Sequence, residues 1–95
     1  MKPLLDVLII LDALEKEGSF AAASAKLYKT PSALSYTVQK LESDLNIQIL
    51  DRSGHRARFT RTGQMLLEKG REVLHTVREL EKQAVKLHQG WENEL

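Results

Sequence analysis

The sequence predicts a mainly helical fold in which three short helices and a small two-stranded hairpin precede one long helix. Apolar residues recur at every third or fourth position along most of the chain, as on one face of an amphipathic helix. Residues 47–59 combine strand-forming residues with a Ser-Gly pair, which is typical of a hairpin. The C-terminal third keeps a seven-residue apolar repeat without proline, which indicates one long helix.

The composition is that of one small globular domain. The chain has 95 residues, of which 42% are hydrophobic and 28% are charged, as in ordinary globular proteins. It contains no cysteine, which excludes disulfides and thiolate metal sites. No apolar run approaches the roughly 20 residues of a membrane span, and no signal peptide is recognisable. We therefore expect a cytoplasmic protein without cofactor, metal or membrane partner.

The first two helices are bounded by small residues. The first is expected over residues 3–17, and Gly18 is a helix stop. The hydroxyl of Ser19 can accept a free N–H of the second helix, residues 20–27, whose many alanines let another helix approach closely. The apolar stripe of the first helix consists of Leu4, Val7, Leu8, Leu11 and Leu14.

The third helix is expected from Pro31 to about Leu45, with Thr30 as its N-cap. Proline is tolerated at the first position because its missing N–H would have no helical partner there. Asn46 is expected to end the helix in a left-handed conformation. The core face is predicted to carry Leu34, Val38, Leu41 and Leu45. The opposite face carries hydroxyls, an amide and a phenol, but no acid: Ser32, Ser35, Tyr36 and Gln39.

A hairpin is predicted at about residues 48–60. Its strand-forming residues are Ile47, Ile49, Leu50 and Phe59. The pair Ser53-Gly54 marks a tight turn, and arginines lie at the tip and flanks. A hairpin of this size is marginal alone, so it must pack against the helices.

The last segment, residues 62–95, is predicted to be a long helix that pairs with a second copy. A helix of about 28 residues is roughly 42 Å long, too long to bury its whole apolar face on so small a domain. The alternative is a helix that bends or folds back. The repeat consists of Leu66, Gly70, Val73, Val77, Leu80, Ala84, Leu87 and Trp91. The predicted dimer interface consists of Leu66, Val73, Val77, Leu80, Ala84 and Leu87.

Basic residues gather in two stretches that contain no acid. Residues 18–41 hold three lysines, and residues 52–61 hold four arginines with His55. Such a distribution in a chain of net charge +1 favours one side that faces a polyanion. The alternative is an ordinary solvated surface that happens to be basic.

These elements together predict a winged helix-turn-helix over residues 1–61, with the helix-turn-helix at about 19–45 and the wing at about 48–60. The third helix would enter the DNA major groove, which displays hydrogen-bond donors and acceptors on base edges. The predicted base-reading residues are Ser32, Ser35, Tyr36 and Gln39. The predicted backbone and wing contacts are Lys29, Thr30, Arg52, Arg56 and Arg58.

Residues 17–63 resemble the N-terminal region of LysR-type transcriptional regulators. The resemblance lies in Gly18-Ser19-Phe20, the alanine run, Ser-Ala-Leu-Ser, Lys40-Leu41-Glu42, Leu50-Asp51-Arg52, and Thr60 with Gly63. It implies sequence-specific binding of double-stranded DNA by a homodimer on an inverted repeat, with usually antiparallel long helices. It also implies that full-length dimers join into tetramers and that a small effector binds only a C-terminal domain. We expect this chain to lack that domain and to be an excised DNA-binding portion; the alternative is a natural fragment.

The chain departs from the family pattern at two positions of the third helix. The family usually has Gln where this chain has Pro31, and often Arg where it has Tyr36. Only helix initiation is therefore assigned to Pro31. Contact roles are carried over to Ser32, Ser35, Tyr36, Arg52 and Arg56.

Two other classes of function are alternatives to DNA binding. An enzyme is disfavoured, because His55, His75 and His88 are scattered and no catalytic or nucleotide-binding motif is present. A protein-interaction module, in which the helix-turn-helix only supports a coiled-coil dimer, stays open. Sequence preference for DNA distinguishes this module from a DNA-binding domain.

Overall fold

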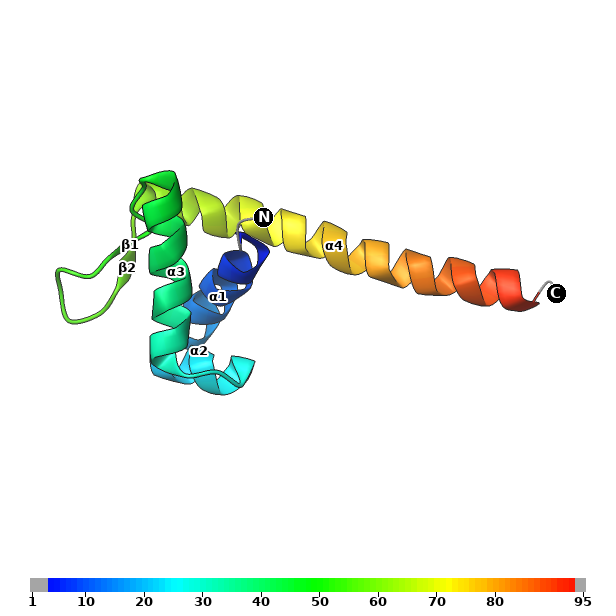
Figure 1. Ribbon diagram of the computed structural model, residues 1–95, viewed down its shortest axis with the longest axis horizontal. Coiled ribbons are helices and arrows are strands. Elements are labelled where there is room, and N and C mark those ends of the chain that lie inside the picture. Colours follow the sequence, from blue (N-terminus) through cyan, green and yellow to red (C-terminus); the bar gives the residue numbers. More distant parts are fainter. Residues whose placement is uncertain (1–3, 94–95) are drawn as a thin grey trace.

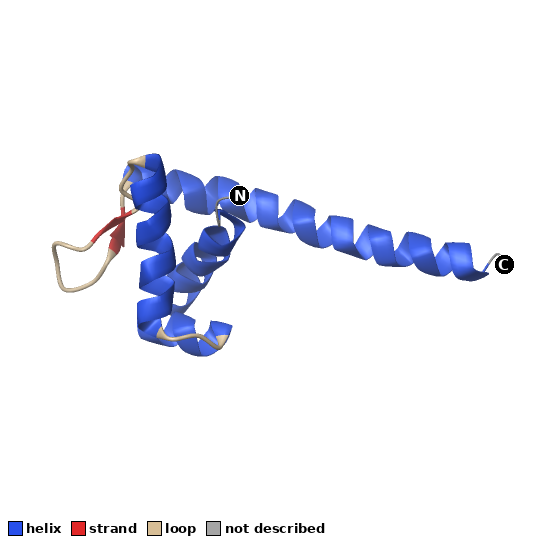
Figure 2. Cartoon of the chain, in the orientation of Figure 1, coloured by secondary structure: helices blue, strands red, loops and turns tan. Residues whose placement is uncertain are grey.

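The computed structural model describes residues 4–93, with no side-chain description beyond residue 90. A block of three helices carries the hairpin on one side, and the last helix leaves the block as a long arm (Figures 1 and 2). The elements are α1 (Leu4–Glu17), α2 (Phe20–Leu27), α3 (Pro31–Leu45), β1 (Leu50–Asp51), β2 (Arg58–Phe59) and α4 (Arg61–Asn93). The predicted order of elements is thus confirmed, and Trp91 of the predicted repeat lies outside the described side chains.

Small polar residues begin and end the helices as the sequence predicts. Gly18 has a φ of 88°, a left-handed value that glycine adopts freely. The hydroxyl oxygens of Ser19 and Thr30 accept backbone N–H groups at 3.1 Å, from residues 22 and 33 respectively. Asn46 ends α3 with a φ of 54°. Local chemistry therefore determines where α2 and α3 begin and where α1 and α3 end.

The core lies where α1, α2 and α3 meet the hairpin and the start of α4. Its fully buried large side chains are Leu11, Leu34, Leu41, Ile49, Leu50, Val7 and Val38. The prediction that Leu45 belongs to this core is wrong, because its side chain is 44% exposed. The chain turns away at Asn46, and Ile47 then packs partly buried against the core.

The hairpin is shorter, and its loop longer, than predicted. Leu50 pairs with Phe59 and Asp51 pairs with Arg58 in antiparallel register, so residues 52–57 form the loop. The prediction of a tight turn at Ser53-Gly54 is therefore wrong. The Asp51 carboxylate accepts both the backbone N–H of Ser53 at 2.9 Å and its hydroxyl at 2.7 Å. This Asx-type contact bends the chain before a two-residue turn can form.

The first half of α4 packs on its own domain and the second half does not. Leu67 and Leu74 are buried. A Cβ atom on Gly70 would lie 2.6 Å from Cδ2 of Leu8, so α4 and α1 approach closely there. Gly70 and partly buried Leu66 therefore serve packing within the chain, which corrects the single continuous seam that the repeat suggested. Beyond residue 80 the described side chains of α4 are exposed.

Candidate nucleic-acid interface

The outer face of α3 is largely exposed to solvent. Ser32, Tyr36 and Gln39 are exposed, and Ser35 is half-buried. Within the described part of the chain, Ser32 lies 3.4 Å from the hydroxyl of Thr30, and no side-chain hydrogen bond involves the other three. Folding therefore leaves the donors and acceptors of this face available to a partner.

The acids of α3 lie at its C-terminal end, away from this polar face. Asp44 is paired with Lys40 at 3.2 Å, and Glu42 faces the hairpin. The first turn of α3 contains no acid, and the helix dipole makes this N-terminal end partly positive. The N-terminal half of α3 therefore presents no negative charge to a polyanion.

Glu42 joins α3 to the hairpin, a role that the sequence did not reveal. Its Oε2 atom accepts the backbone N–H groups of Ile49 at 2.7 Å and Leu50 at 3.1 Å. Its Oε1 atom lies 3.4 Å from Nη1 of Arg52. Three donors on one partly buried carboxylate fix where the hairpin starts relative to α3. The only signal in the sequence was the Lys40-Leu41-Glu42 motif.

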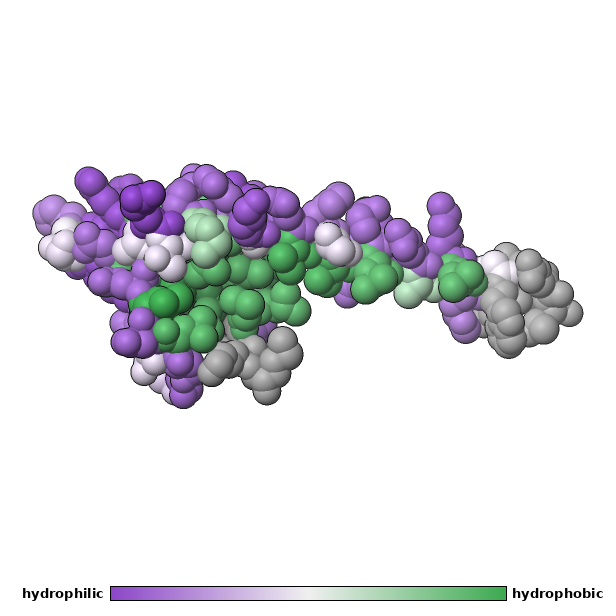
Figure 3. Space-filling model, turned by 90° about the horizontal axis from the view of Figure 1, so that it is seen from above, coloured by the Kyte–Doolittle hydropathy of each residue, from purple (hydrophilic) through white to green (hydrophobic). Residues whose placement is uncertain are grey.

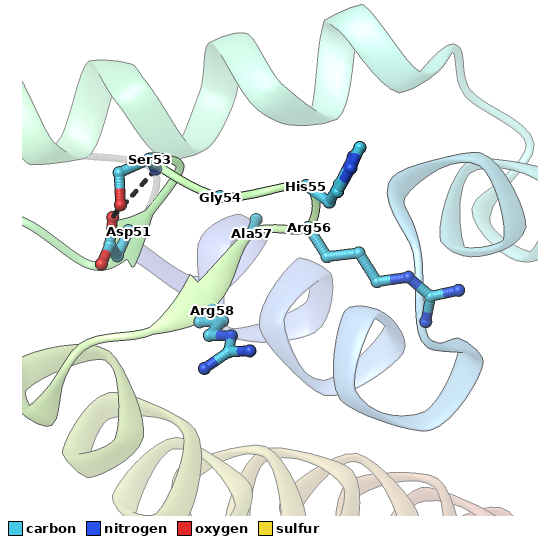
Figure 4. Close-up of a pocket in the computed structure, with 7 residues that line it drawn as sticks. All are labelled: Asp51, Ser53, Gly54, His55, Arg56, Ala57 and Arg58. Carbon is cyan, nitrogen blue, oxygen red and sulfur yellow. Dashed lines mark hydrogen bonds between the residues drawn. The ribbon is translucent and has the colours of Figure 1, made fainter.

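The arginines of the hairpin fall into two groups. Arg56 and Arg58 are exposed, and their side chains extend from the loop and from β2 (Figure 4). The guanidinium of Arg52 instead lies beside Glu42 and 5.9 Å from the centre of the Phe20 ring. Its Nη2 atom is buried. Arg52 therefore sits between α2, α3 and the hairpin, whereas Arg56 and Arg58 face solvent.

Thr60 and Gly63 join the hairpin to α4. The Thr60 hydroxyl donates to the Gln48 carbonyl oxygen at 2.6 Å and accepts the N–H of Gly63 at 3.0 Å. A Cβ atom on Gly63 would collide with the Ile49 carbonyl oxygen. The sequence shows this Thr and Gly only as part of the family pattern, because their contacts with Gln48 and Ile49 span more than ten residues.

The acid of the hairpin stays charged at neutral pH. Hydrogen bonds from the backbone and hydroxyl of Ser53 lower the pKa of Asp51 below its usual value, and the Arg58 charge adds to this effect. Arg58 is also its strand partner. The positive charge that the loop offers to a partner therefore comes chiefly from Arg56, with Arg58 partly balanced by Asp51.

No group of three or more His, Asp or Glu side chains within residues 4–90 could hold a metal ion. In the same part of the chain, no helix is long and apolar enough to cross a membrane.

Residues 5–64 match the model of the bacterial regulatory helix-turn-helix proteins of the lysR family. The chain belongs to the lysR family. This member is 93% identical over 95 residues to the uncharacterized HTH-type transcriptional regulator YeeY of Escherichia coli (strain K12), and covers 31% of that protein. It is 50% identical over 91 residues to the probable HTH-type transcriptional regulator YhaJ of the same strain, covering 96% of the chain and 30% of that protein. The chain thus spans about a third of the length of these relatives.

Solved structures of LysR-type domains have the same fold as this lysR-family chain. The complex of BenM_DBD with catB site 1 DNA matches with a TM-score of 0.84 and 28% identity, over 90% of this chain and 92% of that one. The CbnR_DBD–DNA complex matches with a TM-score of 0.77 and 26% identity, over 86% and 94% of the two chains. The prediction of a winged helix-turn-helix of the LysR type is confirmed.

Proposed function

We propose that this chain is the part of a LysR-type transcriptional regulator that recognises a specific sequence in double-stranded DNA. The outer face of α3 lies in the major groove, and the wing, residues 52–57 with its two strands, lies on the backbone and the adjacent minor groove. The observation that carries this proposal is the exposed face of α3, which is acid-free in its N-terminal half and has unused hydrogen-bonding groups. The two structural neighbours described above are themselves DNA complexes.

Base readout is assigned to Ser32, Ser35, Tyr36 and Gln39. Hydroxyl and amide groups both donate and accept, which suits the mixed pattern of base edges in the major groove. Ser35 is half-buried, so it suits a base close to the helix axis. Tyr36 and Gln39 extend further from the helix. Pro31 starts α3 and takes no part in readout.

Affinity is assigned to contacts with phosphates by Lys29, Thr30, Arg56 and Arg58. The first two lie at the positive end of the α3 dipole, and the two arginines are exposed on the wing. Arg52 was expected to join them, but its guanidinium is engaged with Glu42 and Phe20. We therefore assign it to positioning the wing.

The second half of α4 is assigned to a homodimer that binds an inverted repeat. Val73, Leu80, Ala84 and Leu87 are exposed, and apolar side chains continue from the helical block along one face of α4 (Figure 3). Antiparallel pairing of two such faces would bury them. Half-sites would then lie about one helical turn apart or a multiple of it. Tetramer formation and effector binding belong to the longer regulators of the family, through a further domain.

Selection of bound sites from random duplex DNA, at a stated salt concentration, tests this function. The wild-type chain should enrich one inverted repeat. The double variant Ser35→Glu, Tyr36→Ala should lose this preference with little change in melting temperature, because neither side chain supports the core. Gln89→Glu, which adds a charge on the outer side of α4, is the matched control and should retain the preference.

The outcomes separate the three classes of function. An unchanged preference in the double variant would show that α3 does not read the bases. If the wild-type chain enriches no site and binds no duplex, the interaction module becomes the better explanation.

The role of the wing is tested by combining Arg56→Ala with Arg58→Ala. This double variant should weaken binding to every sequence. The slope of log affinity against log salt concentration should become less steep by about 0.9 for each phosphate contact that is lost. A loss confined to one base position would instead mean that the wing reads sequence.

A further inference from the structure

The turn between α2 and α3 contains a residue that the fold does not explain. Tyr28 ends α2 in the left-handed conformation, with φ 57° and ψ 42°. Its backbone N–H bonds to the carbonyl oxygens of Ala25 and Ser24. The only other described non-glycine residue with positive φ is Asn46, which ends α3 in the same way. Asparagine tolerates this conformation, whereas a bulky side chain there is strained.

No packing within the chain compensates for this strain. The side chain of Tyr28 is 95% exposed, the largest value among the exposed large hydrophobic residues of the described chain. Neither a side-chain hydrogen bond nor a ring contact involves it within the described residues. Glycine or asparagine would satisfy the backbone of this cap better. The aromatic ring therefore adds nothing to folding that these residues would not supply, which points to a role outside the chain.

The surroundings of Tyr28 favour a polyanion as the partner. Lys26 and Lys29 flank it and are exposed, and no acid occurs in residues 18–41. The turn leads directly into the N-terminus of α3 (Figure 1), where the helix dipole adds positive charge. A phenol suits a sugar–phosphate backbone, because its O–H can donate to a phosphate oxygen while its ring packs against the sugar.

We propose that Tyr28 is a DNA-contacting residue, which donates its phenolic hydrogen bond to a backbone phosphate beside the half-site read by α3. This inference rests on the proposed function. It adds to that function a contact from the turn between α2 and α3, which would fix the depth and register of α3 in the major groove. A phosphate contact carries no base information of its own, so Tyr28 should strengthen binding to every sequence.

Two substitutions separate the proposed role from a structural one. Tyr28→Asn keeps a residue that adopts the left-handed cap, and Tyr28→Phe removes only the hydroxyl. The melting temperature of the 95-residue chain and its affinity for the selected duplex and for a random duplex are measured. Tyr28→Asn should melt a few degrees higher than wild type and bind both duplexes about tenfold more weakly. Tyr28→Phe should have the melting temperature of wild type and should show most of the affinity loss expected for Tyr28→Asn.

Asn46→Gly is the matched control, because it changes the other left-handed cap and should leave affinity unchanged. Wild-type affinity in both Tyr28 variants would overturn the proposal. A lower melting temperature in Tyr28→Asn together with full affinity in Tyr28→Phe would also overturn it, because the ring would then be structural. If the wild-type chain itself binds no duplex, the proposed function fails, and that result is distinct from unchanged binding by the variants.

Discussion

The two halves of α4 are both amphipathic, but their apolar side chains have different surroundings. Leu74 is 5% exposed, whereas Leu80, less than two turns further along, is 64% exposed. The face that packs on the domain consists of Gly63, Leu67, Gly70 and Leu74, of which only Gly70 belongs to the seven-residue repeat, and the free face consists of the repeat residues Val73, Leu80, Ala84 and Leu87. A periodic pattern therefore shows that a helix is amphipathic, but not which partner each part of its stripe contacts.

The largest effect is expected where α4 meets the hairpin. Gly63→Ala places a Cβ atom against the Ile49 backbone carbonyl, which cannot move aside as a flexible side chain can. We expect a loss of about 3 kcal/mol in the free energy of unfolding, measured by denaturant titration. Gly90→Ala, with no atom within 4 Å of its Cβ, is the control and should gain about 0.5–1 kcal/mol. Equal stability of the two variants would contradict the close approach at Gly63.

A second comparison truncates one leucine in each half of α4. Leu74→Ala should lower the free energy of unfolding by about 2–3 kcal/mol, because a buried side chain leaves a cavity. Leu87→Ala should change the stability of the monomer by less than about 0.5 kcal/mol, because its side chain is exposed. Both are measured at concentrations low enough to keep the chain monomeric. A large loss in Leu87→Ala under those conditions would show that α4 folds back.

The free half of α4 can be tested by its effect on assembly. Leu80→Lys should raise the dimer dissociation constant at least tenfold, because it places a charge within the proposed apolar interface. Sedimentation across a concentration series measures this change. Gln89→Lys, on the outer side of the helix, should sediment as wild type does. If Leu80→Lys has an unchanged sedimentation profile, the exposed face of α4 does not pair.

The smallest effect concerns the ion pair that links the first half of α4 to α1. Arg71 donates to Asp12 at 2.9 Å, and Lys16 lies 3.1 Å from the same carboxylate. Burial alone would raise the pKa of Asp12, but the hydrogen bonds and charges of Arg71 and Lys16 outweigh it and lower the pKa.

Because this pKa is lowered in the folded state, the stabilisation is complete above the unfolded pKa of about 3.9 and is lost as the pH falls below it. Wild type should therefore melt a few degrees above Asp12→Asn at pH 7, and the difference should shrink towards pH 3. A difference that does not vary with pH would mean that Asp12 acts through packing alone.

Features that depend on neighbouring residues were predictable from the sequence. Ser19, Thr30 and Asn46 cap helices because their own backbone and side-chain chemistry favours it, and the polar face of α3 follows from helical spacing. Features that depend on distant partners were not. The exposure of Leu45 and the loop of the wing are set by how the chain turns after α3 and at Asp51.

The same limit applied to the candidate interface. The sequence does not distinguish Arg52 from the other wing arginines, whereas the structure places Glu42 and Phe20 beside its guanidinium. Gly63 and Gly70 owe their role to atoms of Ile49 and Leu8, at least fourteen positions away. Such pairs of distant residues cannot be identified in a single sequence, because helical periodicity shows which face is apolar but not which residues pack against it.

The carboxylate of Glu42 binds the hairpin from the inner side of α3. Tyr36 and Gln39 make no side-chain hydrogen bond within the described residues, and Ser32 contacts the neighbouring hydroxyl of Thr30. The exposed side chains of this helix can therefore be substituted without disturbing the fold that positions the helix. A library randomised at those three positions, with Glu42 kept, should yield folded proteins with new operator preferences. Each would still deliver the wing to the same place on the duplex.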